Sequence, residues 1–143
     1  MQYVCDAPGR KTWFRIETEG EAIQEAEAMH HSLDYRFRHE RSAAIASYAP
    51  SPELRPIERN IGLDAHVART MPMFLTLRDA DGTPLATVLL PQSRDCGGTA
   101  PSVVGPDYSD ASAAQADAIA VLEKHLGAVL RRECDSHPGF CAP

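Results

Sequence analysis

Hydrophobic and polar residues alternate on both sides of Asp81-Gly82, a pattern that predicts a β-hairpin over residues 72–91. Glycine accepts the positive φ of a tight turn, and aspartate tolerates it. If Ala80 faces Thr83 across a two-residue turn, one face of the hairpin becomes wholly apolar and the other becomes mixed. The facing pairs on the apolar side are then Met73 with Leu90, Leu75 with Val88 and Leu77 with Ala86. A longer turn would shift this pairing.

Three further strands are expected outside the hairpin. Residues 3–5 and residues 12–17 lie on either side of a turn signal, and the second segment has the aromatic and β-branched content that strands favour. A short strand is expected at residues 102–104. Trp13 is the only tryptophan, and we expect it to pack in the core or on a sheet face.

Apolar residues recur every three or four positions over residues 19–49, which predicts a long helix there. Thr18 is suited to cap its start, and acidic residues come early in it, as the helix dipole favours. Unbroken, this helix would be about 45 Å long, whereas a compact chain of this length is roughly 35 to 40 Å across. The helix must therefore kink, or project and pack on a partner, of which a second copy is the simplest.

A second amphipathic helix is expected over residues 110–133, and Gly127 inside it suggests a bend or a close crossing. Residues 57–70 are ambiguous and could hold one or two helical turns. The remaining segments are expected to be irregular: a proline-rich connector at 50–56, a long loop at 92–109 and a tail at 135–143.

These elements predict an α+β fold in a single domain of residues 1–143. The sheet is expected to be small and antiparallel, with three to five strands centred on the hairpin at 72–91. We expect the two helices, about 19–49 and 110–133, to cover one face of that sheet. A chain of 143 residues is long enough to bury a core without disulfides or metal.

Composition argues against nucleic acid and membranes as partners. The net charge is -6 and aromatic residues make up only 6% of the chain, whereas nucleic acid is bound largely through clustered Lys and Arg. The element order superficially resembles that of a double-stranded-RNA-binding domain, but residues 110–117 lack the lysine cluster that starts the second helix in that family. No apolar run approaches the roughly 20 residues of a membrane span. The first residues lack a signal peptide's features, so we expect a cytoplasmic protein whose four cysteines are thiols or ligands.

A zinc site is the first chemical candidate. Cys134 and His137 have a Cys-x2-His spacing, Cys141 follows four residues later, and Cys96 or Cys5 could supply a fourth ligand. The second close pair of ligands that structural zinc sites usually contain is missing, so unrelated thiols remain the simpler interpretation.

Two other clusters are considered. In a continuous helix, Glu27 with His31 and His30 with Asp34 would each share a face at i,i+4 spacing, and such pairs can bind a metal or exchange protons. A buried, hydrogen-bonded His30 is the plainer alternative. The thiol of Cys96 beside Gly97-Gly98 could act as a nucleophile, with a histidine as its base; the candidate bases are His66 and His125.

No complete catalytic constellation emerges from these residues. The preferred hypothesis is therefore an interaction or regulatory protein without catalytic activity, which self-associates through its long first helix and also uses the 92–109 loop as a contact surface. Its partner is expected to be a second copy or another protein, and no cofactor is expected. The alternative is a small metal-dependent or thiol enzyme that uses either the His30/His31 cluster or Cys96, Cys134 and His137.

Overall fold

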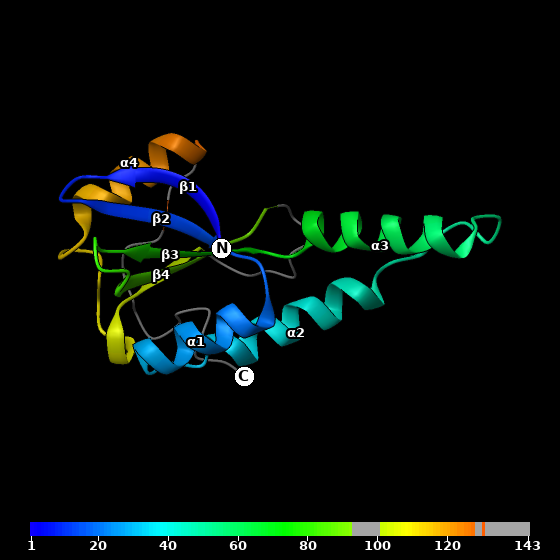
Figure 1. The fold of residues 1–143 in the computed structure, drawn as a ribbon, viewed down its shortest axis with the longest axis horizontal. Coiled ribbons are helices and arrows are strands. Elements are labelled where there is room, and N and C mark those ends of the chain that lie inside the picture. Colours follow the sequence, from blue (N-terminus) through cyan, green and yellow to red (C-terminus); the bar gives the residue numbers. More distant parts are fainter. Residues whose placement is uncertain (93–100, 128–129, 131–143) are drawn as a thin grey trace.

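The computed structural model describes residues 1–92, 101–127 and 130. Its sheet lies between two helical layers, and a pair of helices extends away from it (Figure 1). In chain order the elements are β1 (Gln2–Ala7), β2 (Lys11–Ile16), α1 (Glu19–Met29), α2 (Leu33–Ala46), α3 (Pro56–Thr70), β3 (Met73–Arg78), β4 (Pro84–Leu90), β5 (Ser102–Val104), the 3-10 helix η1 (Pro106–Tyr108) and α4 (Ala116–Leu126).

The five strands form one antiparallel sheet in the order β1-β2-β3-β4-β5, so each strand pairs with its neighbour in sequence. This confirms the α+β class, the central hairpin and the short strand at residues 102–104. The order is a simple meander, because every pair of neighbouring strands is antiparallel and needs no crossover connection.

The β3–β4 hairpin has the predicted register over most of its length, but its turn is different. Leu77 faces Ala86, as expected. The turn, however, is a three-residue loop: the amide of Gly82 donates to the carbonyl of Asp79 at 3.0 Å, and Gly82 has a φ of 84°. A bulge at Leu85 then absorbs the additional residue, which is why the pairing beyond it is unchanged.

Helices cover both faces of the sheet, so the expectation that only one face is covered was wrong (Figure 1). The wholly apolar face of the hairpin packs against α4. Trp13 is fully buried there, and its Nε1 donates to the carbonyl of Ala118 at 2.9 Å, which ties α4 to β2. The main contributors to this core are Trp13, Leu75, Leu77, Val88, Val103, Ile119 and Leu122.

The mixed face of the hairpin packs against α1 and α2. Its apolar part lies under α2, where the rings of Phe37 and Phe74 meet edge to face with centroids 5.2 Å apart. Its polar part lies under α1 and contains Thr76 and Thr87, both fully buried. This face accepts a second helical layer because it combines large apolar side chains with Thr87, whose hydroxyl donates to Glu25 of α1 at 2.6 Å. The hydroxyl of Thr76, in contrast, is buried without a hydrogen-bond partner among the described residues.

The long helix predicted for residues 19–49 is two helices that run in opposite directions (Figure 1). The first begins as expected, with a capping box between Thr18 and Glu21. It ends because His30 adopts the left-handed conformation, with φ 56° and ψ 51°, and the amides of His30 and His31 both donate to the carbonyl of Ala26. Periodicity continued through this break, so it did not reveal the reversal.

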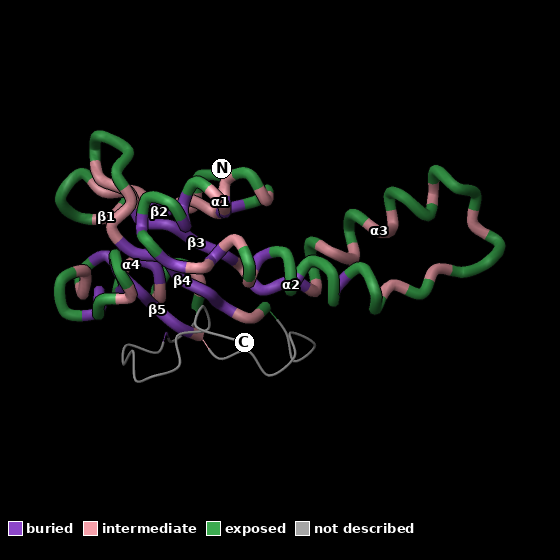
Figure 2. Tube along the Cα trace, turned by 90° about the horizontal axis from the view of Figure 1, so that it is seen from below, coloured by how far each residue is buried: buried purple, intermediate pink, exposed green. Residues whose placement is uncertain are grey.

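The reversed chain builds a projection, which we name the arm: the end of α2, residues 47–55 and α3 (Figures 1 and 2). The ambiguous stretch at 57–70 is thus one continuous helix, and the proline-rich connector forms the tip. Within the arm, Ser47 Oγ lies 2.7 Å from His66 Nε2, and the hydroxyl of Tyr48 donates to the carbonyl of Arg59 at 3.1 Å. Gly62 has no Cβ and so permits Tyr48 to cross α3 this closely.

The last described helix, α4, is shorter than predicted. It begins at Ala116 rather than near Asp110. Residues 112–115 form a separate turn, in which the carboxylate of Asp110 accepts the amide of Ser112 at 2.8 Å and the amide of Gln115 donates to the carbonyl of Ala111 at 2.9 Å. Gly127 adopts the left-handed conformation, with φ 65°, and ends the helix instead of bending it. The tail predicted for 135–143 lies outside the described residues.

Substitution at His30 tests the reversal. We expect the free energy of unfolding of His30→Gly to exceed that of His30→Ala by about 1 kcal/mol, because only alanine strains the left-handed conformation. Both variants lose the same side chain, so chemical denaturation of the pair isolates the backbone effect. If the helix continued through this position, alanine would instead be the more stable by about 1 kcal/mol.

Candidate functional site

Four polar side chains are bonded together between α1 and the sheet, and they form what we name the polar cluster: Glu25, His31, Arg78 and Thr87. Arg78 Nη2 donates to one carboxylate oxygen of Glu25 at 2.7 Å, and the hydroxyl of Thr87 donates to the other at 2.6 Å. Arg78 Nη1 also donates to the carbonyl of Gly82 at 3.2 Å. Glu25 and Thr87 are both 0% exposed.

His31 extends this cluster as a neutral imidazole. Its Nδ1 accepts the amide of Leu33 at 3.3 Å, so the ring proton lies on Nε2, which donates to the hydroxyl of Thr87 over 3.1 Å. Burial lowers the pKa of His31 to about 4, although the nearby carboxylate of Asp34 opposes this shift. A directed chain of hydrogen bonds therefore runs from His31 through Thr87 to Glu25.

The polar cluster stabilises the position of α1 and is not accessible to a substrate. A substrate would have to reach Glu25 or Thr87, and neither side chain is exposed. A buried carboxylate costs several kcal/mol unless it is paired and fully hydrogen-bonded, so α1 can sit on the sheet only where Arg78 and Thr87 both meet Glu25. The cluster thus specifies one position of α1 on the sheet.

The two histidines expected to act together are directed to different surroundings. Because α1 ends at Met29, the i,i+4 pairs expected on a single helix face are not placed as the spacing predicts. His30 is exposed, and its Nδ1 lies 2.9 Å from Asp107 Oδ1 of η1, whereas His31 is buried in the polar cluster. Glu27 is exposed on α1. These residues do not converge on one point.

The cysteine-based candidates lie outside the described residues: Cys96, Cys134, His137 and Cys141. Cys5, considered as a fourth ligand, is buried on β1 in the core beneath α4. Burial, together with the carboxylate of Asp6, raises the pKa of the Cys5 thiol. Within residues 1–92, 101–127 and 130, no three His, Cys, Asp or Glu side chains are grouped so that they could hold a metal ion.

The two histidines considered as bases for Cys96 belong to different parts of the fold. His66 lies on α3, where it meets Ser47 and the ring of Tyr48, with ring centroids 5.3 Å apart. His125 is exposed in the last turn of α4. The structure therefore assigns His66 a packing role within the arm.

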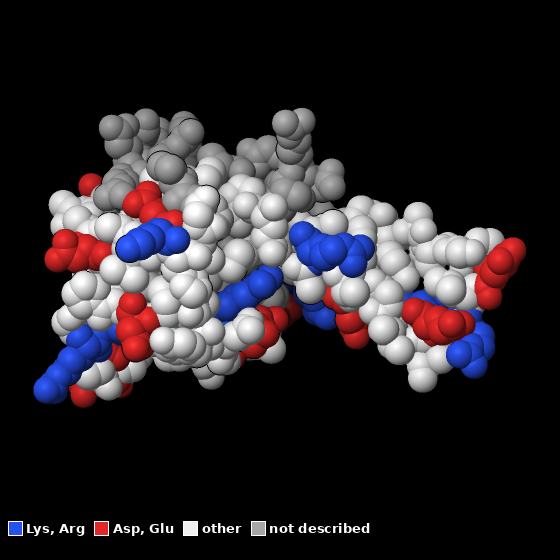
Figure 3. Space-filling view, turned by 90° about the horizontal axis from the view of Figure 1, so that it is seen from above, with Lys and Arg blue, Asp and Glu red and all other residues white. Residues whose placement is uncertain are grey.

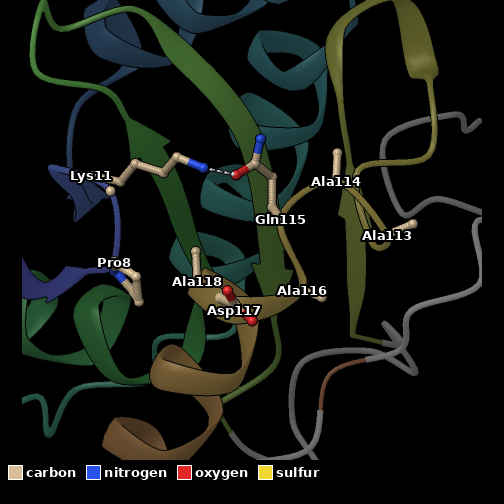
Figure 4. A pocket seen from close by; sticks show the side chains of 9 residues that line it. Pro8, Lys11, Ala113, Ala114, Gln115, Ala116, Asp117 and Ala118 are labelled. Carbon is tan, nitrogen blue, oxygen red and sulfur yellow. Dashed lines mark hydrogen bonds between the residues drawn. The ribbon is translucent and has the colours of Figure 1, made fainter.

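A shallow cavity of about 290 Å³ lies at the start of α4, beside the β1–β2 turn (Figure 4). Helix N-termini attract anions, but the ammonium of Lys11 is here bonded to Gln115 Oε1 at 2.7 Å. Asp117 adds a carboxylate to the first turn of the helix. That negative charge makes the cavity poorly suited to an anionic ligand.

The arm carries the most distinctive surface of the molecule. None of the 15 residues of α3 is buried, and Ile57 and Ile61 are 62% and 65% exposed. Figure 2 shows exposed and half-buried residues along α3, in contrast to the mainly buried strands β3, β4 and β5. Seen from above, its surface is largely uncharged along its length, with acidic and basic side chains at the tip and along one edge (Figure 3). This is a candidate interaction surface.

Comparison of the chain with protein-family models, with curated proteins and with solved structures finds no match to any of them. In the part of the chain that the structure describes, no helix combines the length and the apolar character needed to cross a membrane.

Sequence reasoning missed the polar cluster and the arm. Glu25 lies on the same helical face as Ala22, Ala26 and Met29, which are all buried. A carboxylate on this apolar face was the signal in the sequence that could have indicated a buried polar cluster. The mixed face of the predicted hairpin offered the complementary threonine and arginine. What the pattern could not supply was which helix crosses that face, since the reversal at His30 decides it.

Removing the charge of Glu25 tests the polar cluster. We expect Glu25→Gln to lower the free energy of unfolding by about 3 kcal/mol, because Arg78, whose side chain is only 17% exposed, then keeps its charge without a carboxylate. The control is Glu27→Gln, the same change on the exposed face of the same helix, for which we expect a change within about 0.5 kcal/mol. Urea denaturation of both variants measures the difference, and equal effects would contradict a specific role for Glu25.

Acid should destabilise the fold through His31. Between its ordinary pKa near 6.5 and about 4, the unfolded chain binds a proton at His31 that the folded protein does not, so stability falls as the pH falls. The loss should reach up to about 3 kcal/mol over this range. His31→Gln, which keeps a donor for Thr87, should show a flatter pH profile by that amount. Parallel profiles would mean that His31 titrates normally in the folded state.

Proposed function

We propose that this chain is a non-catalytic interaction protein that self-associates through its arm. The observation that carries the proposal is the exposure of α3: 15 helical residues with none buried, two of them isoleucines more than 60% exposed. The proposal keeps the function that the sequence favoured, but the surface changes. The contact lies on α3, which the reversal at His30 places on the projecting arm, and not on one long first helix.

The stability of α3 supports the proposal, because burial of its exposed side against a partner would stabilise the helix. Helices in proteins gain most of their stability from packing an apolar face, and an isolated helix of about 15 residues is marginal in water. The arm supplies some contacts through Tyr48 and His66 on one side of α3. The opposite side, with Ile57 and Ile61, has apolar surface that would gain free energy from burial against a second protein.

The accessible chemistry supports an interaction role better than an enzymatic one. The polar cluster is closed to substrates, and the cavity beside Lys11 is a poor anion site. The net charge of -6 favours a protein partner over nucleic acid. A cytoplasmic location is part of this proposal.

The test is the subunit count of the whole protein, purified without chelator. Native mass spectrometry and sedimentation over about 1 to 500 µM should show a monomer–dimer equilibrium, as expected for a small interface. Ile61→Asp should weaken the dimer at least about tenfold, because it would bury an unpaired charge. The control, Ala120→Asp, adds the same charge at an exposed position of α4 and should leave association unchanged.

Two results would overturn the proposal. A monomer at every concentration would remove self-association. A bound zinc ion that acid releases would instead favour the alternative of a metal-dependent protein, with Cys96, Cys134, His137 and Cys141 as the first residues to substitute.

A further inference from the structure

The exposed face of α3 has an ordered arrangement of large and small side chains. Its apolar residues are Ile57, Ile61, Ala65 and Ala68, spaced by four, four and three positions, so they share one side of the helix. We name them the α3 stripe. They lie opposite Gly62 and His66, which face Tyr48 and Ser47 of the same arm. Both large residues lie toward the tip, and both small ones lie toward the sheet.

We propose that two copies of this chain pair their α3 helices antiparallel about a twofold axis, with each isoleucine against an alanine of the other copy. This inference rests on the proposed function and specifies its geometry. Antiparallel alignment places Ile57 against Ala68 of the partner subunit, and Ile61 against Ala65 of the partner subunit. Both pairs imply nearly the same centre, close to residue 63, so one alignment satisfies both. A parallel pair would stack isoleucine on isoleucine and leave the alanines apart.

The charges beside the stripe favour the same alignment. Glu58 and Arg69 lie on one flank of α3, eleven positions apart, as Ile57 and Ala68 do. A twofold axis brings equivalent flanks together, so Glu58 meets Arg69 of the partner subunit, and the pair occurs twice. At the start of α3, Glu58 Oε1 accepts the amide of Arg55 and pairs with its guanidinium, both at 3.0 Å, so Arg69 of the partner subunit would bind the second carboxylate oxygen. Exposed ion pairs add little affinity but set orientation.

The surface next to Ala68 is shaped to receive the tip of a second arm. A cavity of about 310 Å³ lies there, between the base of α3 and the ends of the first strands. Its lining is mixed: Phe37, Ala68, Met71 and Phe74 are apolar, whereas Gln2, Arg15 and Glu17 are polar or charged. In the antiparallel pair, Ile57 of the partner subunit reaches Ala68 beside this cavity. Ile57, which is otherwise 62% exposed, would therefore lose exposed area against the apolar part of this lining.

The interface is expected to be weak. A helix of 15 residues is about 22 Å long, so a single helix pair falls at the low end of specific interfaces. Asp64 also lies close to the expected axis, where it would approach Asp64 of the partner subunit. This like-charge contact should limit the affinity at neutral pH.

A size exchange tests the alignment. Ile57→Ala should raise the dimer Kd at least about tenfold, because each of two symmetric contacts loses apolar area. Ala68→Ile should also raise it, because isoleucine then meets isoleucine. The double variant restores one isoleucine and one alanine at each contact, so its Kd should return to within about threefold of the parent's. Thermal unfolding of each variant verifies that the arm is folded.

Asp64→Asn tests the alignment independently, through charge and without any change in the packing of the α3 stripe. It should lower the Kd several-fold, because it removes the like charges near the axis. Asp34→Asn, the same change on α2, should have no such effect.

The outcomes separate the two proposals. A chain that is monomeric at all concentrations overturns both. If Ile61→Asp dissociates the dimer, but the double variant is as weak as the two single changes combined and Asp64→Asn changes nothing, the arm is the interface and the antiparallel alignment is wrong. Recovery in the double variant, together with tighter association of Asp64→Asn, would establish the alignment.

Discussion

The chain reverses between α1 and α2 through one residue, His30, whose φ of 56° lies in the left-handed region. A residue other than glycine is strained there, so other contacts must hold the turn. Two residues of η1 supply these contacts. The hydroxyl of Tyr108 accepts the amide of Ser32 at 2.9 Å, and Asp107 Oδ1 lies 2.9 Å from His30 Nδ1. Without this reversal, α2 would continue away from the sheet, and neither the second core nor the arm could form.

The polar cluster determines where α1 rests. Hydrophobic contacts tolerate small displacements of a helix, whereas a buried carboxylate does not, since every oxygen must keep its donors. Glu25 therefore fixes α1 over β3 and β4 through Arg78 and Thr87. Because α2 follows α1 after a short turn, the position of the arm depends on the same contacts. A core interaction and an exposed surface are in this way connected along the chain.

The sheet with its covering helices, which we call the body, and the arm differ in how much of their apolar surface is buried within the chain. The body buries a hydrophobic core on each side of the sheet. The arm contains a helix with no buried residue, held by a few hydrogen bonds from Ser47 and Tyr48. The proposed interaction role rests on this difference, because the two most exposed large hydrophobic residues of the described chain, Ile57 and Ile61, both lie on α3. The pattern of large and small residues along α3 is the basis for proposing a second copy as the partner.

Local patterns in the sequence were sufficient for the hairpin, its register, the helix cap at Thr18 and the short strand at residues 102–104, because each depends on neighbouring residues. They also showed that the first helical segment was too long for its domain. Only the tertiary structure decided that the segment reverses at His30, that helices cover both sheet faces and that Glu25, Thr87 and Arg78 meet. Those outcomes depend on contacts between residues more than 50 positions apart, such as Arg78 with Glu25, which periodicity does not record.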